Sequence, residues 1–221
     1  MPDWRALATR GESRYRDGGE RLPENDPDAR QRQLTRMGNA AAGAGLAHLM
    51  EGDRERAAEW LARAHDAYRA SWDKAPPGSW GRPIAMLKAR ILVGEWDAAE
   101  EDARWTLEQG AAEAVSPIGR YAACLALLTL GGWEQARVLA DGLRTHDDFP
   151  TAVGHTLAMI AAEDRVGYTE AVEAVLESFE MREEYLEDVP VADTVLVLQA
   201  LAGRRGLAVE LESELLPAVS D

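Results

Sequence analysis

The feature that most constrains the fold is the spacing of the apolar residues, which recur every three or four positions along most of the chain. The stretch DRERAAEWLARAHDAYRASW, which begins at Asp53, is typical. Such spacing places apolar side chains on one face of an α-helix, whereas a half-buried strand needs strict alternation, which the chain does not sustain. The stripe in this stretch consists of Ala57, Trp60, Leu61, Ala64 and Tyr68. The sequence therefore predicts an all-α protein.

The predicted helices contain an internal repeat. Four segments share a short turn followed by a helix that opens on alanine: EGDRERAAEWLARA, VGEWDAAEEDARWT, LGGWEQARVLADGL and RVGYTEAVEAVLES. Their aligned alanines are Ala57, Ala99, Ala136 and Ala171, which are 42, 37 and 35 residues apart. A glycine lies five positions before the first three alanines, at Gly52, Gly94 and Gly131, whereas the fourth segment has Val166 there and Gly167 next to it. This pattern indicates repeated helical hairpins.

Over residues 29–180 the pattern resembles the tetratricopeptide repeat, in which two antiparallel helices pair through small residues. The first helix of each pair then needs a small residue twelve positions before the aligned alanine. Those positions hold Gly45, Leu87, Cys124 and Met159, of which the first and third fit the pattern. The resemblance implies a solenoid, an α-α superhelix of about five helical hairpins, with a concave groove that binds a partner.

The stretch GNAAAGAGLAHLMEGD, which begins at Gly38, has two interpretations. A dinucleotide-binding loop needs G-x-G-x-x-G after a strand, but GAGLAH places His48 in the last position and no strand precedes it. The alternative is a helix whose glycines allow a neighbouring helix to pack closely. We expect helix packing, which must offset a cost of about 1 kcal/mol for each glycine inside a helix.

We predict a single helical-repeat domain over residues 1–221, with an N-terminal helix and loop at 1–28, four hairpins at 29–185, and a closing helix and capping tail at 186–221. The helices are expected at 3–16, 29–50, 54–74, 83–93, 97–109, 118–130, 133–145, 151–164, 168–185 and 190–203. The apolar residues Leu207, Val209 and Leu211 alternate, which favours a tail that lies extended against the last helix.

Charge narrows the possible partners. The net charge is −15 over 221 residues, which argues against nucleic acid or an anionic membrane as a partner. Many Asp and Glu with only two lysines resemble the composition of proteins from salt-loving organisms, so most acidic residues are expected to form a solvated surface. The chain shows no leader segment or membrane span, which favours a cytoplasmic protein. Cys124 lies in an apolar stretch and is expected to be a buried, inert thiol.

One segment concentrates aromatic and positive side chains in this acidic chain. The predicted partner-binding residues are Trp72, Trp80, Arg82, Lys88, Arg90 and Arg120. Trp and Arg are favoured as anchors in protein interfaces. The alternative is that Trp80 covers the core at the start of a helix while the cations lie on a solvated face.

The sequence carries no recognisable catalytic motif. None of the four histidines forms a metal-binding pair, and His48 is expected to be a satisfied residue on a packing face. We therefore predict no catalytic residue, no metal and no cofactor. The alternative is an enzyme for a small molecule or nucleotide, with a site in the groove near Arg82, Arg90 and Arg120. A pocket that gathers titratable groups with shifted pKa would favour the enzyme. The acidic stretch Glu163 to Asp193 would suit a basic partner or a solvated surface.

The C-terminal part, AVLESFEMREEYLEDVPVADTVLVLQALAGRRGLAVELESELLP, spans residues 174–217. It resembles the closing segment of the immunity-49 family of polymorphic-toxin immunity proteins, with an Ala/Leu helix, an R-x-G-[IL]-x-[VI] step and an S-x-Y-L-P ending. Leu215 replaces the tyrosine of that ending. The resemblance implies a non-enzymatic helical protein that neutralises a toxin by binding it. Together these features predict a protein-binding module, in an immunity role or as an adaptor.

Overall fold

A computed structural model describes residues 2–218, and within them the chain forms ten α-helices, one 3-10 helix and no strand. The predicted all-α class is therefore confirmed. The helices cluster into two compact units. Unit 1 comprises residues 2–93, 182–192 and 212–218, and unit 2 comprises residues 94–181 and 193–211. The predicted single repeat domain stays a prediction, and its outermost residues, 1 and 219–221, lie outside the described residues.

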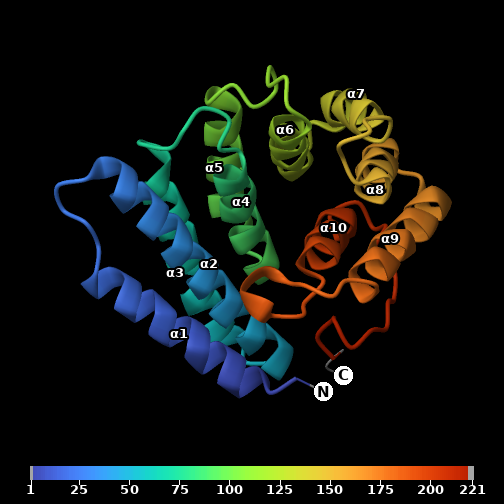
Figure 1. The fold of residues 1–221 in the computed structure, drawn as a ribbon. Helices are drawn as coiled ribbons and strands as arrows, with labels where there is room; N and C mark the ends of the chain where they lie inside the picture. The colour runs from blue at the N-terminus through green and yellow to red at the C-terminus, as the bar shows by residue number, and fades with distance from the viewer. Residues whose placement is uncertain (1, 219–221) are drawn as a thin grey trace. The chain divides into compact units, whose positions relative to one another are not determined.

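Unit 1 packs neighbouring helices of the chain against one another, α1 on α2, α2 on α3 and α3 on α4 (Figure 1). Their bounds are α1 Trp4–Glu20, α2 Pro27–Glu51, α3 Arg54–Trp72 and α4 Gly81–Val93, and the 3-10 helix η1, Leu186–Asp188, packs on α2. Aspartate side chains cap three of these helices at their N-termini. The capping residues are Asp3, Asp26 and Asp53, each bonded to the backbone N–H three positions on.

Three glycines of α1 and α2 lie at close contacts between neighbouring helices. A Cβ added at Gly45 would lie 2.7 Å from Leu61 Cγ on α3, and one added at Gly38 would lie 2.7 Å from the Tyr68 ring. On α1, a Cβ at Gly11 would lie 2.7 Å from the carbonyl oxygen of Ala40 on α2. The helix-packing interpretation of this glycine-rich stretch is therefore confirmed.

Unit 2 also packs consecutive helices, from α5 on α6 through to α8 on α9, and α10 packs on α8 and α9 (Figure 1). The bounds are α5 Trp96–Glu108, α6 Pro117–Leu130, α7 Trp133–Leu143, α8 Thr151–Ala162, α9 Arg165–Glu180 and α10 Asp193–Gly203. Ser116 and Asp164 cap α6 and α9 through their side chains. Gly131 ends α6 in the left-handed conformation, with φ 75°.

The aligned small residues of the repeat lie in the cores of the two units. Ala57, Ala99 and Ala136 are fully buried, and Ala171 is nearly so. The buried thiol of Cys124 on α6 lies 3.5 Å from the carbonyl oxygen of Ala136 on α7. The two residues that the repeat alignment places opposite each other in this hairpin are thus in contact.

Several predicted boundaries differ from the structure. The loop expected from Asp17 is wrong for residues 17–20, because α1 continues to Glu20. Gly18 is buried there, where an added Cβ would lie 2.6 Å from Met37 Cγ. The helix expected at 168–185 instead runs from Arg165 to Glu180, and the last helix begins at Asp193.

The C-terminal tail is extended against the last helix, as predicted. The Gln199 side chain on α10 accepts a hydrogen bond from Val209 N at 3.1 Å and donates one to Val209 O at 2.5 Å. The Tyr168 hydroxyl on α9 donates to the same Gln199 oxygen at 2.6 Å. One amide therefore fixes the tail to α10 and α9.

Candidate functional site

The two predicted tryptophan anchors lie together in unit 1. Trp72 ends α3, Trp80 precedes α4, and the intervening turn brings their ring centroids to 5.6 Å with the planes tilted by 46°. Both side chains are half-buried. The carbonyl oxygen of Trp80 accepts a hydrogen bond from Ile84 N at 3.2 Å, so Trp80 also lies at the start of α4. The pair offers a partly exposed aromatic surface and at the same time covers the end of the α3–α4 contact.

Arg82 connects three helices of unit 1. Its Nε donates to Ser71 Oγ on α3 at 2.7 Å, and its Nη2 donates to Gln31 Oε1 on α2 at 2.5 Å. Burial lowers the pKa of the Arg82 guanidinium from its ordinary value. Two donor nitrogens of this side chain, Nε and Nη2, are engaged inside the unit, so Arg82 supports the surface around the tryptophans.

The other predicted cations lie in different places. Lys88 and Arg90 are half-buried on α4, and Arg90 Nη2 lies 3.5 Å from His65 Nδ1. Arg120 belongs to unit 2, where its Nε donates to the carbonyl oxygen of Ala114 at 3.2 Å. Unit 1 therefore holds five of the six predicted residues, in the segment from the end of α3 through α4.

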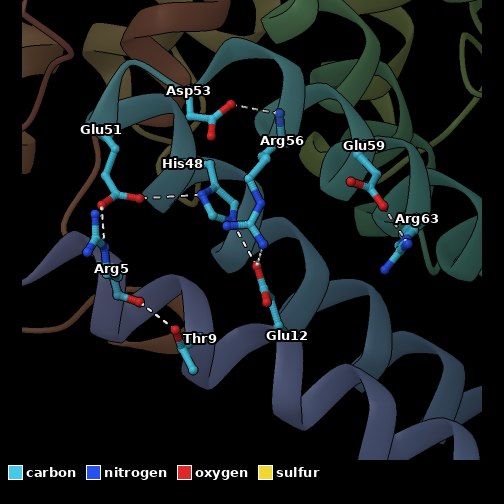
Figure 2. A network of polar contacts seen from close by, with 9 residues as sticks. All are labelled: Arg5, Thr9, Glu12, His48, Glu51, Asp53, Arg56, Glu59 and Arg63. Carbon is cyan, nitrogen blue, oxygen red and sulfur yellow. Dashed lines mark hydrogen bonds and ion pairs between the residues drawn. The ribbon is translucent and has the colours of Figure 1, made fainter.

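A buried histidine organises a polar network between α1, α2 and α3 (Figure 2). His48 is 2% exposed, its Nε2 lies 2.8 Å from Glu12 Oε1, and its Nδ1 lies 3.4 Å from Glu51 Oε2. Arg56 Nη2 lies 3.4 Å from the same Glu12 oxygen, and Arg5 Nε lies 3.9 Å from Glu51. His48 lies on a packing face, as predicted, but only its Nε2 is satisfied: Nδ1 is buried and has no hydrogen-bond partner within the described residues, so the prediction of a fully satisfied histidine is wrong for that atom. Glu12 and His48 are 36 positions apart, which conceals this pairing in the sequence.

A cleft of about 510 Å³ in unit 1 was not predicted from the sequence. Its lining comes from α1, α2 and the turn around η1: Arg14, Asp17, Gly18, Arg21, Gln33, Arg36, Met37, Ala40 and Glu187. Three of these residues are arginines, in a chain with a net charge of −15. We name it the arginine cleft. No local motif marks it, because Glu187 lies at least 147 residues along the chain from the other lining residues, the nearest being Ala40.

Two adjacent arginines after α10 connect four helices of unit 2. Arg204 lies over the Trp96 ring and donates to the carbonyl oxygen of Thr129 near the end of α6. Arg205 lies over the Trp133 ring, with 4.5 Å to its centroid. Arg205 also donates to two carbonyls in the last turn of α8, Ile160 and Ala161, of which Ile160 also accepts from Glu163 N at 3.2 Å. The RRG sequence thus has a structural role that its pattern alone did not reveal.

Three groups with a clearly shifted pKa lie at packing positions. Burial raises the pKa of the Cys124 thiol and that of the Tyr168 hydroxyl, both in unit 2, and lowers the pKa of Arg82 in unit 1. None of the three lines the arginine cleft. Within residues 2–218, no cluster of three or more His, Cys, Asp or Glu side chains is placed to hold a metal ion.

Comparisons with protein-family models, with curated proteins and with solved structures find no match to this chain. None of the helices in the described part of the chain has the length and apolar character needed to cross a membrane.

Proposed function

We propose that this protein is a non-catalytic protein-binding module, built from tetratricopeptide-like hairpins that form an α-α superhelix. The observation that carries the proposal is the contact between Cys124 and the backbone of Ala136, at the spacing that the repeat alignment requires. Chains built of such hairpins bind partners over extended surfaces.

The partner surface that we propose is the segment from the end of α3 through α4, with Trp72, Trp80, Lys88 and Arg90 as contact residues. Half-buried aromatic and cationic side chains are typical anchors of protein interfaces. Arg82 supports this surface from inside through its bonds to Ser71 and Gln31. Arg120, in unit 2, is a separate candidate contact.

A toxin-neutralising immunity role is one form of the proposal, and an adaptor role in a larger assembly is the other. The resemblance of residues 174–217 to the immunity-49 family supports the first form. In that form the partner is a toxin encoded beside this chain, and both proteins meet in the cytoplasm.

The test is capture of a partner on the tagged protein in extract from the source organism, at that organism's own salt concentration, followed by calorimetry with the purified partner. We expect one partner at a stoichiometric ratio. Lys88→Glu should weaken its affinity at least about tenfold, whereas Arg137→Glu, the same charge change at an exposed residue of α7, should not. Failure to obtain a stoichiometric partner would refute the binding role. Equal affinities of the two variants would refute the α3–α4 surface.

A further inference from the structure

The arginine cleft has the opposite charge character to most of the chain. Arg14, Arg21 and Arg36 face only two acidic lining residues, Asp17 and Glu187. All three arginines are exposed to solvent, which leaves their guanidinium groups hydrated and charged. A volume of about 510 Å³ lies within the usual range for ligand sites. The cleft is therefore large enough to receive an anionic group from outside.

Close packing of α1 and α2 shapes the base of the cleft. Gly18 on α1 lies against Met37 on α2, and no larger residue fits without a shift of that methionine. Gln33 Nε2 donates to the carbonyl oxygen of Gly18 at 3.2 Å and so fixes the two helices beside the cleft. The base of the cleft is thus held by packing and a hydrogen bond, and the arginines extend from a rigid frame.

The arginines of the cleft differ in their partners. Arg14 Nη1 forms an ion pair with Glu187 Oε2 at 2.6 Å. The side chains of Arg21 and Arg36 form no hydrogen bond or ion pair with any residue in the described range 2–218. A guanidinium group presents a planar fork of donors that matches a carboxylate. Two such forks are therefore unoccupied beside one that already holds a carboxylate.

Glu187, whose carboxylate pairs with Arg14 in the cleft, belongs to a strained segment. Glu187 and Asp188 have φ of 57° and 55°, in the left-handed region that non-glycine residues rarely adopt. Arg10 holds this turn through a hydrogen bond to the carbonyl oxygen of Glu187 and an ion pair with Asp188 at 3.3 Å. Gly43 on α2 leaves room for the Glu187 side chain, because an added Cβ would lie 3.2 Å from Glu187 Cβ. Backbone strain of this kind often marks functional sites.

We propose that the arginine cleft binds a carboxylate-rich peptide segment of the partner protein, with Arg21 and Arg36 as anchors and Glu187 as an internal competitor on Arg14. The expected contacts are of the same kind as the Arg14–Glu187 pair, in which an arginine of the cleft binds a glutamate side-chain carboxylate. The proposal rests on the proposed function, because it supplies the chemistry of one contact with that partner.

The test is calorimetry at low salt with an acetylated and amidated hexaglutamate peptide, and with hexaglutamine and inorganic phosphate as competing probes. The net charge of −15 repels a polyanion generally, so binding of hexaglutamate should report a local site. We expect Arg21→Gln with Arg36→Gln to weaken its binding at least about tenfold. The control is Arg54→Gln with Arg137→Gln, which removes the same charge at exposed arginines that do not line the cleft and should leave the affinity unchanged. Glu187→Gln should strengthen binding, because it frees Arg14.

Equal binding to the two double variants, or equally tight binding of hexaglutamine or phosphate, would overturn the proposal, as would the absence of hexaglutamate binding. The thermal melts of both double variants should match that of the parent, since all four arginines are exposed. If a captured partner binds the Arg21→Gln, Arg36→Gln variant as tightly as the parent, the proposed role of the cleft is refuted and the protein-binding role stands. Hexaglutamate binding that is lost in the cleft variant supports the cleft even where no partner is captured.

Discussion

The sulfur atom of Cys124 on α6 lies 3.5 Å from the carbonyl oxygen of Ala136 on α7. Both residues are fully buried, and their small side chains let the two helices approach at this point. The contact therefore defines how the hairpin pairs, and enlarging either residue must push its helices apart or displace neighbours.

Ala136→Leu should lower the free energy of unfolding by about 1–3 kcal/mol, because three extra carbons have no space at this contact. Ala99→Leu, at the matching position of α5, should have a similar effect since Ala99 is also fully buried. Urea denaturation followed by circular dichroism measures both. Val138→Leu is the control on α7, because Val138 is 73% exposed and should change stability by less than about 0.5 kcal/mol. Unchanged stability of both alanine variants would disprove the repeat alignment.

Stability should fall at alkaline pH in a way that depends on Cys124. Burial raises the pKa of this thiol above its ordinary value of 9.0, so the folded state keeps a proton that the unfolded state loses. The stabilisation is complete below pH 9 and decreases above it, by up to about 1.4 kcal/mol per pH unit. Denaturation of the parent and of Cys124→Ala at pH 8 and pH 10 measures it, and the variant should lose less stability. Parallel declines would contradict the assignment.

Gly45→Ala should destabilise unit 1 although alanine is the better helix former. The new methyl group would lie 2.7 Å from Leu61 Cγ and 3.2 Å from Leu61 N, and the backbone atom has little freedom to move. We expect a loss of about 1–3 kcal/mol, larger than the gain of about 1 kcal/mol from helix propensity. The matched variant Gly81→Ala, at the start of α4, has nothing within 4 Å of its added Cβ and should be neutral or slightly stabilising. Thermal denaturation should therefore show a lower melting temperature for Gly45→Ala than for the parent, and an unchanged or slightly higher one for Gly81→Ala.

Arg205→Ala should destabilise unit 2 by about 1–3 kcal/mol, because the carbonyl groups of Ile160 and Ala161 lose the hydrogen bonds from Arg205 and the Trp133 ring loses its contact with the guanidinium. Arg205→Lys should recover only part of this loss, since lysine keeps the charge but loses the planar stacking on Trp133. Chemical denaturation with tryptophan fluorescence follows both effects. Full recovery by lysine would show that charge alone matters at this position. Arg137→Ala, on the exposed surface of α7, is the control.

Glu12→Gln should cost about 1–3 kcal/mol of stability, because the buried His48 and Arg56 both lose a charged acceptor. Glu59→Gln is the matched control: its ion pair with Arg63 lies on the surface of α3 and should contribute less than about 0.5 kcal/mol. A double-mutant cycle with His48→Gln then measures the coupling of His48 to Glu12. A coupling energy near zero would show that the His48–Glu12 contact does not help to hold α1 against α2.

Local features of the structure were predictable from the sequence, because they depend on neighbouring residues. The turn at Gly131 and the pairing of Cys124 with Ala136 lie within one hairpin, and spacing alone predicts them. The predicted end of α1 at residue 16 was wrong, because the burial of Gly18 against Met37 outweighs the tendency of two glycines to end a helix.

The sequence predicted only part of the candidate site. The tryptophan pair is local, and its proximity follows from a short turn. The arginine cleft depends on a contact between Arg14 and Glu187, which are 173 residues apart. The contact between Arg205 and the end of α8 spans 45 residues and follows no local pattern. Side chains that meet over such separations are set by tertiary packing.

Each unit is completed by a late segment of the chain, residues 182–192 in unit 1 and residues 193–211 in unit 2, which has a consequence during synthesis. On the ribosome, α1 to α3 emerge long before Glu187, and α5 to α8 emerge long before Arg204 and Arg205. Neither unit therefore has its full set of contacts until residues 182–211 have left the exit tunnel. Nascent chains that pause near residue 180 should expose helix ends that the finished protein covers.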